Sequence, residues 1–324
     1  MRSLAPALRA VAAGVGTWLL IQSLLFILVQ SAPGGPAAAL AGDYATRETQ
    51  AAITRSYALD RPVVAQYVSF LTGMARGDFG ISYQFRRPVG ELILDRIGPT
   101  LALMLTALGL SVLAGRAIGI WAASRRDGAG WVALAAAAVH ALPVFWVGQL
   151  LMLSLGLELA WFPLSGMSDL RRQAGGVAGV VDVAWHAVLP VMTLALHQTA
   201  FFVTVAYAKA RLENDKDYVR AARARGLTEW AVVWGHLSRN VAPQLATATL
   251  NHVGMLFTGA VLVETLFAWP GLGRLLTSAI LSRDHPVLLG VFALITSTVI
   301  VSSVIAALVQ TRLDPRLAEG RSIA

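Results

Sequence analysis

Residues Pro286–Gln310 read PVLLGVFALITSTVIVSSVIAALVQ, a run of 25 residues without a charged side chain. A helix needs about 20 apolar residues to cross a bilayer, so this run predicts a transmembrane helix. Further segments approach the same length and apolar character, and together they predict an all-α membrane protein with about six transmembrane helices. These segments are Ala10–Gln30, Pro99–Ala123, Trp131–Leu155, Trp185–Tyr207 and Val241–Val263.

The composition of the chain also favours lipid as the solvent. Hydrophobic residues make up 56% of the 324 residues and charged residues only 14%, whereas soluble proteins carry about 25% charged residues. Cysteine is absent, which excludes disulfides and thiolate metal sites. The first apolar run exceeds the 7–15 residues or so of a signal peptide, so we expect it to be retained as a span.

The placement of lysine and arginine predicts the orientation. With a cytoplasmic N-terminus, fourteen basic and seven acidic residues fall on the cytoplasmic side, and eleven of each fall on the other side. Because cytoplasmic loops carry an excess of Lys and Arg, both termini are predicted to be cytoplasmic. The net charge of +8 is therefore interpreted as a topology signal rather than as a nucleic-acid-binding surface.

The connection between the fourth and fifth spans, residues 208–240, is the most informative polar segment. It reads as two short helices, about Asn214–Arg225 and Glu229–Arg239. Gly226 suits the left-handed residue of a helix C-cap, and Thr228 suits the N-cap of the second helix. Apolar residues recur at helical spacing, which predicts an amphipathic element that docks on a soluble partner or lies on the bilayer. They are Leu227, Trp230, Val233, Trp234 and Leu237.

Residues 32–97 are predicted to form an extracytoplasmic segment with short helices. Its first part holds the breaker Pro33–Pro36 and the amphipathic stretch Thr46–Tyr57, and a second amphipathic stretch covers Pro62–Met74. The connection Gly156–Ala184 is predicted to be a loop on the outer surface. We therefore expect two parts, residues 1–97 with the first span, and residues 98–324 with five spans and the cytoplasmic loop 208–240.

Several enzyme classes lack their motifs in this sequence. The only two lysines, Lys209 and Lys216, have no preceding glycine, so a phosphate-binding Gly-x-x-x-x-Gly-Lys loop is absent. Any ATP hydrolysis must then take place on another chain. An intramembrane serine protease would need a buried serine near a histidine, and a surface location for the candidate Ser165 is the favoured alternative. The candidate bases are His186, His197 and His252.

Two segments of the 208–240 connection carry a family resemblance. Asp217–Leu227, DYVRAARARGL, and His236–Asn240, HLSRN, resemble the EAA loop of membrane subunits of binding-protein-dependent ABC importers of the dipeptide, oligopeptide and nickel class. Arg220 stands where the general consensus has Glu, as is common in this branch. Further segments resemble the same branch in the same order; they are Leu59–Pro62, Gly77–Gly80, Ser82, Arg87–Val89, Val263–Gly273, Arg283–Pro286 and Leu313–Arg316.

The resemblance implies a type I ABC importer permease fold in the bacterial inner membrane. It implies that the chain translocates peptides or a related small solute, such as nickel, which an extracytoplasmic binding protein delivers. The implied partners are a second homologous permease and two ATPase subunits, which would hold ATP and Mg²⁺, so no cofactor is expected in this chain and the chain is not an enzyme. The residues implied to couple to the ATPase are Tyr218, Arg220, Ala221, Ala222, Arg223, Arg225, Gly226, Leu227 and Asn240.

Polar residues within or near the fifth span are candidates for lining the transport pathway. Asn251 and His252 fall near the middle of this span, and Glu264 falls near its outer end. A polar group at membrane depth faces protein or a water-filled cavity, so it either lines a pathway or bonds to a neighbouring helix. An ion-coupled secondary transporter that uses His252 is the alternative function, and neighbouring genes for an ATPase and a binding protein would argue against it.

Overall fold

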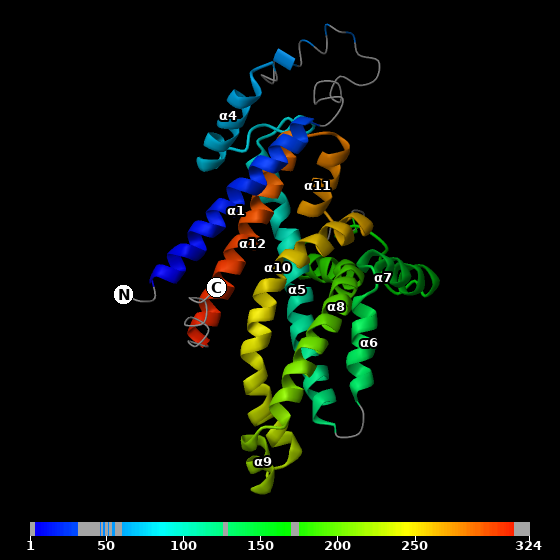
Figure 1. Ribbon diagram of the computed structural model, residues 1–324. Coiled ribbons are helices and arrows are strands. Elements are labelled where there is room, and N and C mark those ends of the chain that lie inside the picture. Colours follow the sequence, from blue (N-terminus) through cyan, green and yellow to red (C-terminus); the bar gives the residue numbers. More distant parts are fainter. Residues whose placement is uncertain are drawn as a thin grey trace. The chain divides into compact units, whose positions relative to one another are not determined.

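The computed structural model describes residues 4–31, 60–125, 129–169 and 175–313, with isolated described residues at 46, 48, 51, 54 and 55. Within these ranges the secondary structure is helical, apart from an isolated antiparallel bridge between Ile81 and Pro88. The breaker Pro33–Pro36 and most of the predicted stretch Thr46–Tyr57 lie outside the described residues. The all-α prediction is confirmed for the described part of the chain (Figure 1).

Five helices in the described ranges are long and apolar enough to cross a membrane. Most of the apolar surface of these spans stays exposed in the isolated chain, as expected for helices that lipid or other subunits cover. Each contains one of the predicted spans, and five predicted spans are thereby confirmed. The helices are α1 (Leu4–Ser31), α5 (Val89–Ser124), α8 (Gly176–Asn214), α10 (Ser238–Leu266) and α12 (His285–Leu313).

The third predicted span, Trp131–Leu155, is wrong as a continuous helix. Its residues form α6 (Gly130–His140), then α7 (Val144–Leu151) and a π-helical segment η1 (Met152–Glu158). The two pieces are bent by 93°. Pro143 lies at the break as the N-cap of α7, because proline donates no backbone hydrogen bond and disfavours the helical conformation of the residue before it.

Two other helix boundaries differ from the prediction. The helix α5 begins at Val89, ten residues before the predicted Pro99, which lies inside it. The helix α8 begins at Gly176, so the predicted loop Gly156–Ala184 is shorter than expected. Gly175 is the N-cap of α8 in an extended conformation, and the apolar residues that follow Gly176 are helical.

The chain divides into two compact units, and each is described separately. One comprises Met1–Thr100 and Pro270–Val304, and the other comprises Leu101–Trp269 and Ile305–Ala324. The division of the sequence into residues 1–97, with the first span and the extracytoplasmic segment, and residues 98–324, with five spans, remains a prediction.

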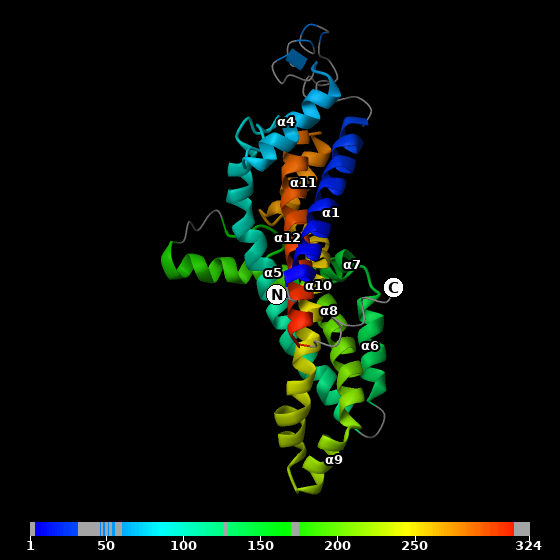
Figure 2. The same cartoon turned by 60° about the vertical axis from the view of Figure 1, so that its left-hand side comes forward.

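In the first unit, α1 packs along α12 and beneath α4 (Val63–Ala75), an arrangement that Figures 1 and 2 both show. Trp18 Nε1 donates a hydrogen bond to Ser297 Oγ at 2.9 Å. A Cβ on Gly14 would lie 2.8 Å from Ile300 Cγ2, so glycine permits this close helix contact. Phe26 fits between the rings of Tyr67 and Phe70, with ring centroids 5.3 and 5.5 Å away.

The loop before α5 is tied to the turn between α11 (Leu272–Leu281) and α12. Asp284 is fully buried, and its Oδ2 accepts hydrogen bonds from Ser82 Oγ and from the backbone N–H of Gln84. Its other oxygen accepts from the N–H of Val287 at the start of α12. Ser82 and Asp284 each belong to a family-like segment of the sequence, and the structure shows that these segments meet.

In the second unit, the later part of α5 packs closely on α8. A Cβ on Gly115 would lie 2.4 Å from Phe202 Cβ, and one on Gly119 would lie 2.7 Å from the carbonyl oxygen of Val203. Small residues let helix backbones approach in this way. The helix α6 lies beside α8 in both views (Figures 1 and 2).

Candidate functional site

The connection between α8 and α10 forms a compact corner in the second unit, which includes the short helix α9 (Asp217–Ala224) (Figure 1). The first predicted helix, Asn214–Arg225, is confirmed in its centre, although Asn214 is the last residue of α8. The second predicted helix, Glu229–Arg239, is helical but not separate. It runs through the π-helical segment η2 (Ala231–Leu237) directly into α10.

Glu213 anchors the corner, and sequence reasoning did not single it out. Its side chain is 5% exposed and accepts hydrogen bonds from Lys209 Nζ at 3.0 Å, Lys216 Nζ at 2.8 Å and Tyr218 Oη at 3.0 Å. A buried carboxylate is tolerable when several donors pair with it in this way. Burial and the adjacent Glu213 carboxylate raise the pKa of Tyr218 to about 12, so the phenol stays protonated and keeps donating near neutral pH.

Replacing Glu213 with alanine is expected to loosen this corner. Hydrogen bonds to a charged group contribute about 1.5–3 kcal/mol, but the two lysines are 33% and 54% exposed. Solvent screening reduces the expected loss to about 1 kcal/mol, or about fivefold more local opening. Trypsin cleavage after Arg220 and Arg225 in the purified protein measures that opening.

Asp217→Ala is the control for this prediction, because Asp217 is 95% exposed and, among the described residues, its ion pair is with Arg220 on the surface of α9. The control should be cleaved at the rate of the unchanged protein. Equal cleavage rates for Glu213→Ala and Asp217→Ala would show that Glu213 does not hold the corner.

Gly226 ends α9 with φ +80°, as the sequence predicted. The N–H of Gly226 bonds to the carbonyl of Arg223 at 2.9 Å, and the N–H of Leu227 bonds to the carbonyl of Ala222 at 3.4 Å, which is a Schellman C-cap. A Cβ on Gly226 would meet no atom within 4 Å, so glycine is needed for its conformation rather than for space. Thr228 Oγ1 accepts from the N–H of Ala231, which confirms the predicted N-cap.

The inner face of the corner is a small apolar cluster of Val219, Ala222 and Val232, against which Tyr218 packs. Arg223 spans the corner, since its guanidinium donates to Glu229 Oε1 and to Asn214 Oδ1, each at 2.8 Å.

The tip of the corner, residues 224–230, is exposed throughout. It includes two large apolar side chains, Leu227 at 41% and Trp230 at 73% exposure. The predicted apolar stripe therefore splits, because Val233 and Leu237 point into the core of the second unit. The stripe was predicted from α-helical spacing. Because a π-helical turn holds more residues than an α-helical turn, η2 rotates the residues within and after it away from the predicted face.

The other predicted coupling residues take different positions. Arg220, Ala221 and Arg225 are exposed. Asn240 is also exposed, and its Nδ2 donates to the carbonyl of His236 at 2.9 Å. Behind the tip, Arg116 on α5 donates hydrogen bonds to Ser238 Oγ, which joins α5 to the junction of η2 and α10.

A cavity of about 330 Å³ lies elsewhere in the second unit, between α6, α7, α8 and α10. Of the three predicted pathway residues, His252 lines it, whereas Asn251 is exposed and Glu264 is fully buried further along α10. The structure adds His140, His197 and Gln198 to the lining, which no sequence pattern had grouped. The ring of His252 stacks on Phe201 with centroids 4.4 Å apart.

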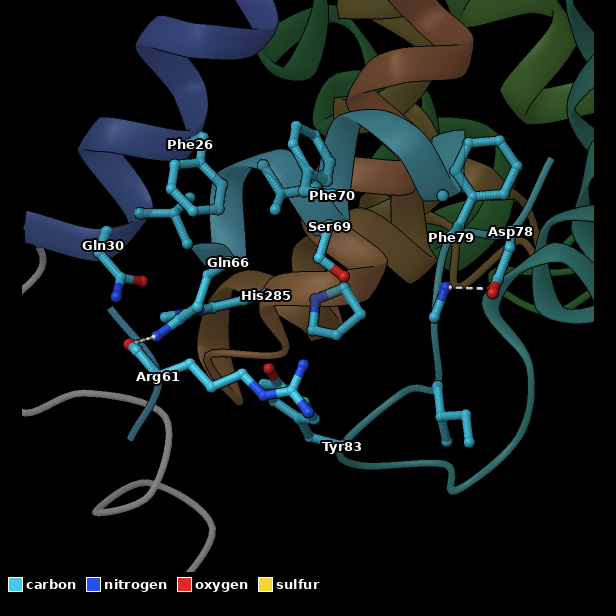
Figure 3. A pocket seen from close by; sticks show the side chains of 16 residues that line it. Phe26, Gln30, Arg61, Gln66, Ser69, Phe70, Asp78, Phe79, Tyr83 and His285 are labelled. Atoms are coloured by element: carbon cyan, nitrogen blue, oxygen red, sulfur yellow. Dashed lines mark hydrogen bonds between the residues drawn. The ribbon is translucent and has the colours of Figure 1, made fainter. Parts of the chain in front are cut away.

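The first unit contains an open pocket of about 410 Å³. Figure 3 shows Phe26 and Phe70 on one part of its wall, and Gln66, which donates to the carbonyl of Arg61 at 2.9 Å. Asp78 accepts from the N–H of Gly80 on the opposite side of the view. The pocket thus combines an aromatic wall with polar groups from residues 61–83.

Comparison with known proteins agrees with the family resemblance. The family model of the binding-protein-dependent transport system inner membrane component matches residues 115–319, and a model of the N-terminal part of such components matches residues 4–104. A "Probable peptide ABC transporter permease protein" of Sinorhizobium fredii is 31% identical over 312 residues, which cover 96% of this chain and 98% of that protein. A dipeptide transport system permease protein of Escherichia coli is 30% identical over 333 residues, with 96% and 97% coverage. The chain therefore belongs to the family of binding-protein-dependent transport system inner membrane components, which are multi-pass proteins of the inner membrane.

Proposed function

We propose that this chain is the membrane-spanning permease subunit of an ATP-driven importer for peptides. The observation that carries the proposal is the exposed tip, residues 224–230, which stands on a hydrogen-bonded corner at the end of two long apolar helices. The two peptide permeases to which the chain is similar along nearly its whole length support peptides as the substrate class.

In this proposal the tip transmits the movement of an ATPase subunit to the membrane helices. A rigid element passes on a displacement that a flexible loop would absorb. The bonds of Glu213 and the bridge by Arg223 supply that rigidity. Leu227 and Trp230 are the apolar side chains that enter the partner's groove, and Arg220 and Arg225 contact polar groups at its rim.

The assembly we propose contains this chain, a second homologous permease, two ATPase subunits and an extracytoplasmic binding protein. ATP and Mg²⁺ bind to the ATPase subunits. The tip and both termini face the cytoplasm, in agreement with the basic excess on that side. The segment from residue 32 to 97, which carries much of the wall of the 410 Å³ pocket, faces the binding protein.

Reconstitution of the complete complex in liposomes tests this function. We expect peptide uptake that requires both ATP and peptide-loaded binding protein. Uptake driven by an ion gradient without ATP would instead establish a secondary transporter, and the buried His252 would then be the first residue to examine.

Trp230→Asp is expected to release the ATPase subunits from the complex. Buried interface tryptophans commonly contribute about 2 kcal/mol or more, which corresponds to about 30-fold weaker association. Copurification of the ATPase with the permease at low concentration measures the loss. Leu281→Asp is the control, because Leu281 is 81% exposed but lies in the first unit. Full retention of the ATPase by Trp230→Asp would exclude the tip as its docking site.

A further inference from the structure

Two of the polar groups that line the cavity in the second unit have no hydrogen-bond partner among the described residues. Gln198 is 3% exposed, and its Oε1 accepts no hydrogen bond from the described residues. Nδ1 of His197 is also buried and unpaired in the described part of the chain. Buried polar atoms are nearly always hydrogen-bonded in folded proteins, so two unpaired atoms on one cavity indicate a missing partner.

The hydrogen bonds around the cavity limit what that partner can be. Nδ1 of His140 lies 3.3 Å from the carbonyl oxygen of His197, and because a carbonyl only accepts, this nitrogen carries the proton. In the neutral ring the other nitrogen of His140 is then an acceptor. Gln198 Oε1 is a second acceptor, so a partner in the cavity has to offer hydrogen-bond donors, such as N–H groups.

The ten described residues that line the cavity include no Asp, Glu, Lys or Arg. An isolated carboxylate or ammonium group would have no counter-charge there, and burial of an unpaired charge is strongly unfavourable. The rest of the wall is largely apolar, with Leu194, Met255 and Leu262 among its residues. A neutral donor group with apolar surroundings fits this lining better than an ion.

We propose that the cavity transiently binds the main-chain amide groups of the peptide during its passage, with Gln198 as the residue that pairs with a peptide N–H. This inference rests on the proposed peptide importer. A glutamine carboxamide can pair with a peptide group through its oxygen and its NH₂, as two peptide groups pair. Since every peptide has this group, such a site accepts peptides with different side chains.

The size of the cavity agrees with binding of part of a peptide at a time. A volume of about 330 Å³ is at the lower end of the range of about 300–1,000 Å³ for ligand pockets. His252 is held in the wall by its stacking on Phe201, which fixes one side of the cavity. A site of this kind holds one or two residues and releases them again, as transport requires.

The test uses the reconstituted complex and two peptides that differ by one methyl group on a central amide nitrogen. Methylation removes the N–H donor and leaves the charges of the peptide unchanged. Uptake is measured per ATP hydrolysed, with the binding protein saturated by either peptide. In the unchanged complex we expect the methylated peptide to be transported about tenfold less, because a site built around a hydrogen bond rejects an analogue that lacks it.

Gln198→Met keeps the approximate size of the side chain and removes the carboxamide. We expect it to transport the unmodified peptide about tenfold less and to lose the discrimination between the two peptides. Gln149→Met is the matched control, because Gln149 is an exposed glutamine on α7, and it should keep both rates. Any preference of the binding protein for one peptide is the same in both complexes. A change in discrimination between the unchanged complex and Gln198→Met therefore reports on the cavity alone.

Equal transport of the two peptides by the unchanged complex would overturn the inference without any variant. Discrimination in Gln198→Met as large as in the unchanged complex would overturn it as well. If the unchanged complex transported no peptide at all, the proposed function would fail together with the inference. If it transported peptide without dependence on Gln198, the inference alone would fail.

Discussion

Gly226→Val is expected to reduce ATP-driven transport about 100-fold while the protein still inserts into the membrane. The residue has φ +80°, a conformation that costs a β-branched side chain about 3 kcal/mol. This cost opposes the Schellman turn that places Leu227 and Trp230 at the tip. Because 1.4 kcal/mol corresponds to a factor of ten, the competent conformation falls by about two orders of magnitude.

The measurement is binding-protein-stimulated ATPase activity together with peptide uptake, and both should fall. Gly226→Asn separates conformation from bulk, since asparagine tolerates the left-handed region. It should retain most of the activity. Gly235→Val adds the same bulk at an exposed position of η2 whose φ lies outside the left-handed region, and it should be nearly normal.

Normal transport by Gly226→Val would rule out a coupling role for this turn. Equal inactivity of Gly226→Asn would show that side-chain size against the partner, rather than backbone strain, is decisive.

The membrane helices could be predicted because their length and apolar character follow from the thickness of the bilayer. Their ends could not be predicted equally well. The first ten residues of α5 include Glu91, Asp95 and Arg96. These charges lower the hydropathy of the segment, so the apolar run begins only at Pro99. In the structure Arg87 pairs with Glu91 and Asp95 at this end of the helix, and such contacts leave no trace in hydropathy.

Proline gives a similarly incomplete signal. Pro190 and Pro243 lie inside the continuous helices α8 and α10, whereas Pro143 separates α6 from α7. The missing N–H is the same in all three cases. Whether the helix continues depends on packing by neighbouring helices, which the local sequence does not show.

In the candidate site, too, the features that follow from local chemistry could be predicted, and those that depend on the tertiary fold could not. The C-cap at Gly226 and the N-cap at Thr228 follow from local chemistry, and both were predicted. The bonds of Glu213 were missed, although Lys209 and Lys216 stand four residues before and three residues after it, a spacing that signals ion pairs on a helix. The cavity around Gln198 involves residues from several helices, and only the tertiary fold brings them together.

The Gly119 contact between α5 and α8 predicts the second large effect, which concerns stability. A Cβ at this position would lie 2.7 Å from Ala206 Cβ and 2.7 Å from the carbonyl oxygen of Val203. The backbone of α8 cannot move aside as a flexible side chain could, so a larger residue forces the two helices apart. Gly119→Leu is therefore expected to destabilise the second unit by about 3 kcal/mol.

The measurement is the thermal stability and yield of the purified protein, with Gly109→Leu as the control. Gly109 lies on the same helix, and a Cβ there would meet no atom within 4 Å. The two variants carry the same chemical change and have the same effect on intrinsic helix propensity, so their difference isolates the packing of α5 on α8. Similar stability of the two variants would contradict this close packing. A loss confined to Gly119→Leu would show that the close packing of α5 on α8 stabilises the second unit, which contains both the corner and the cavity.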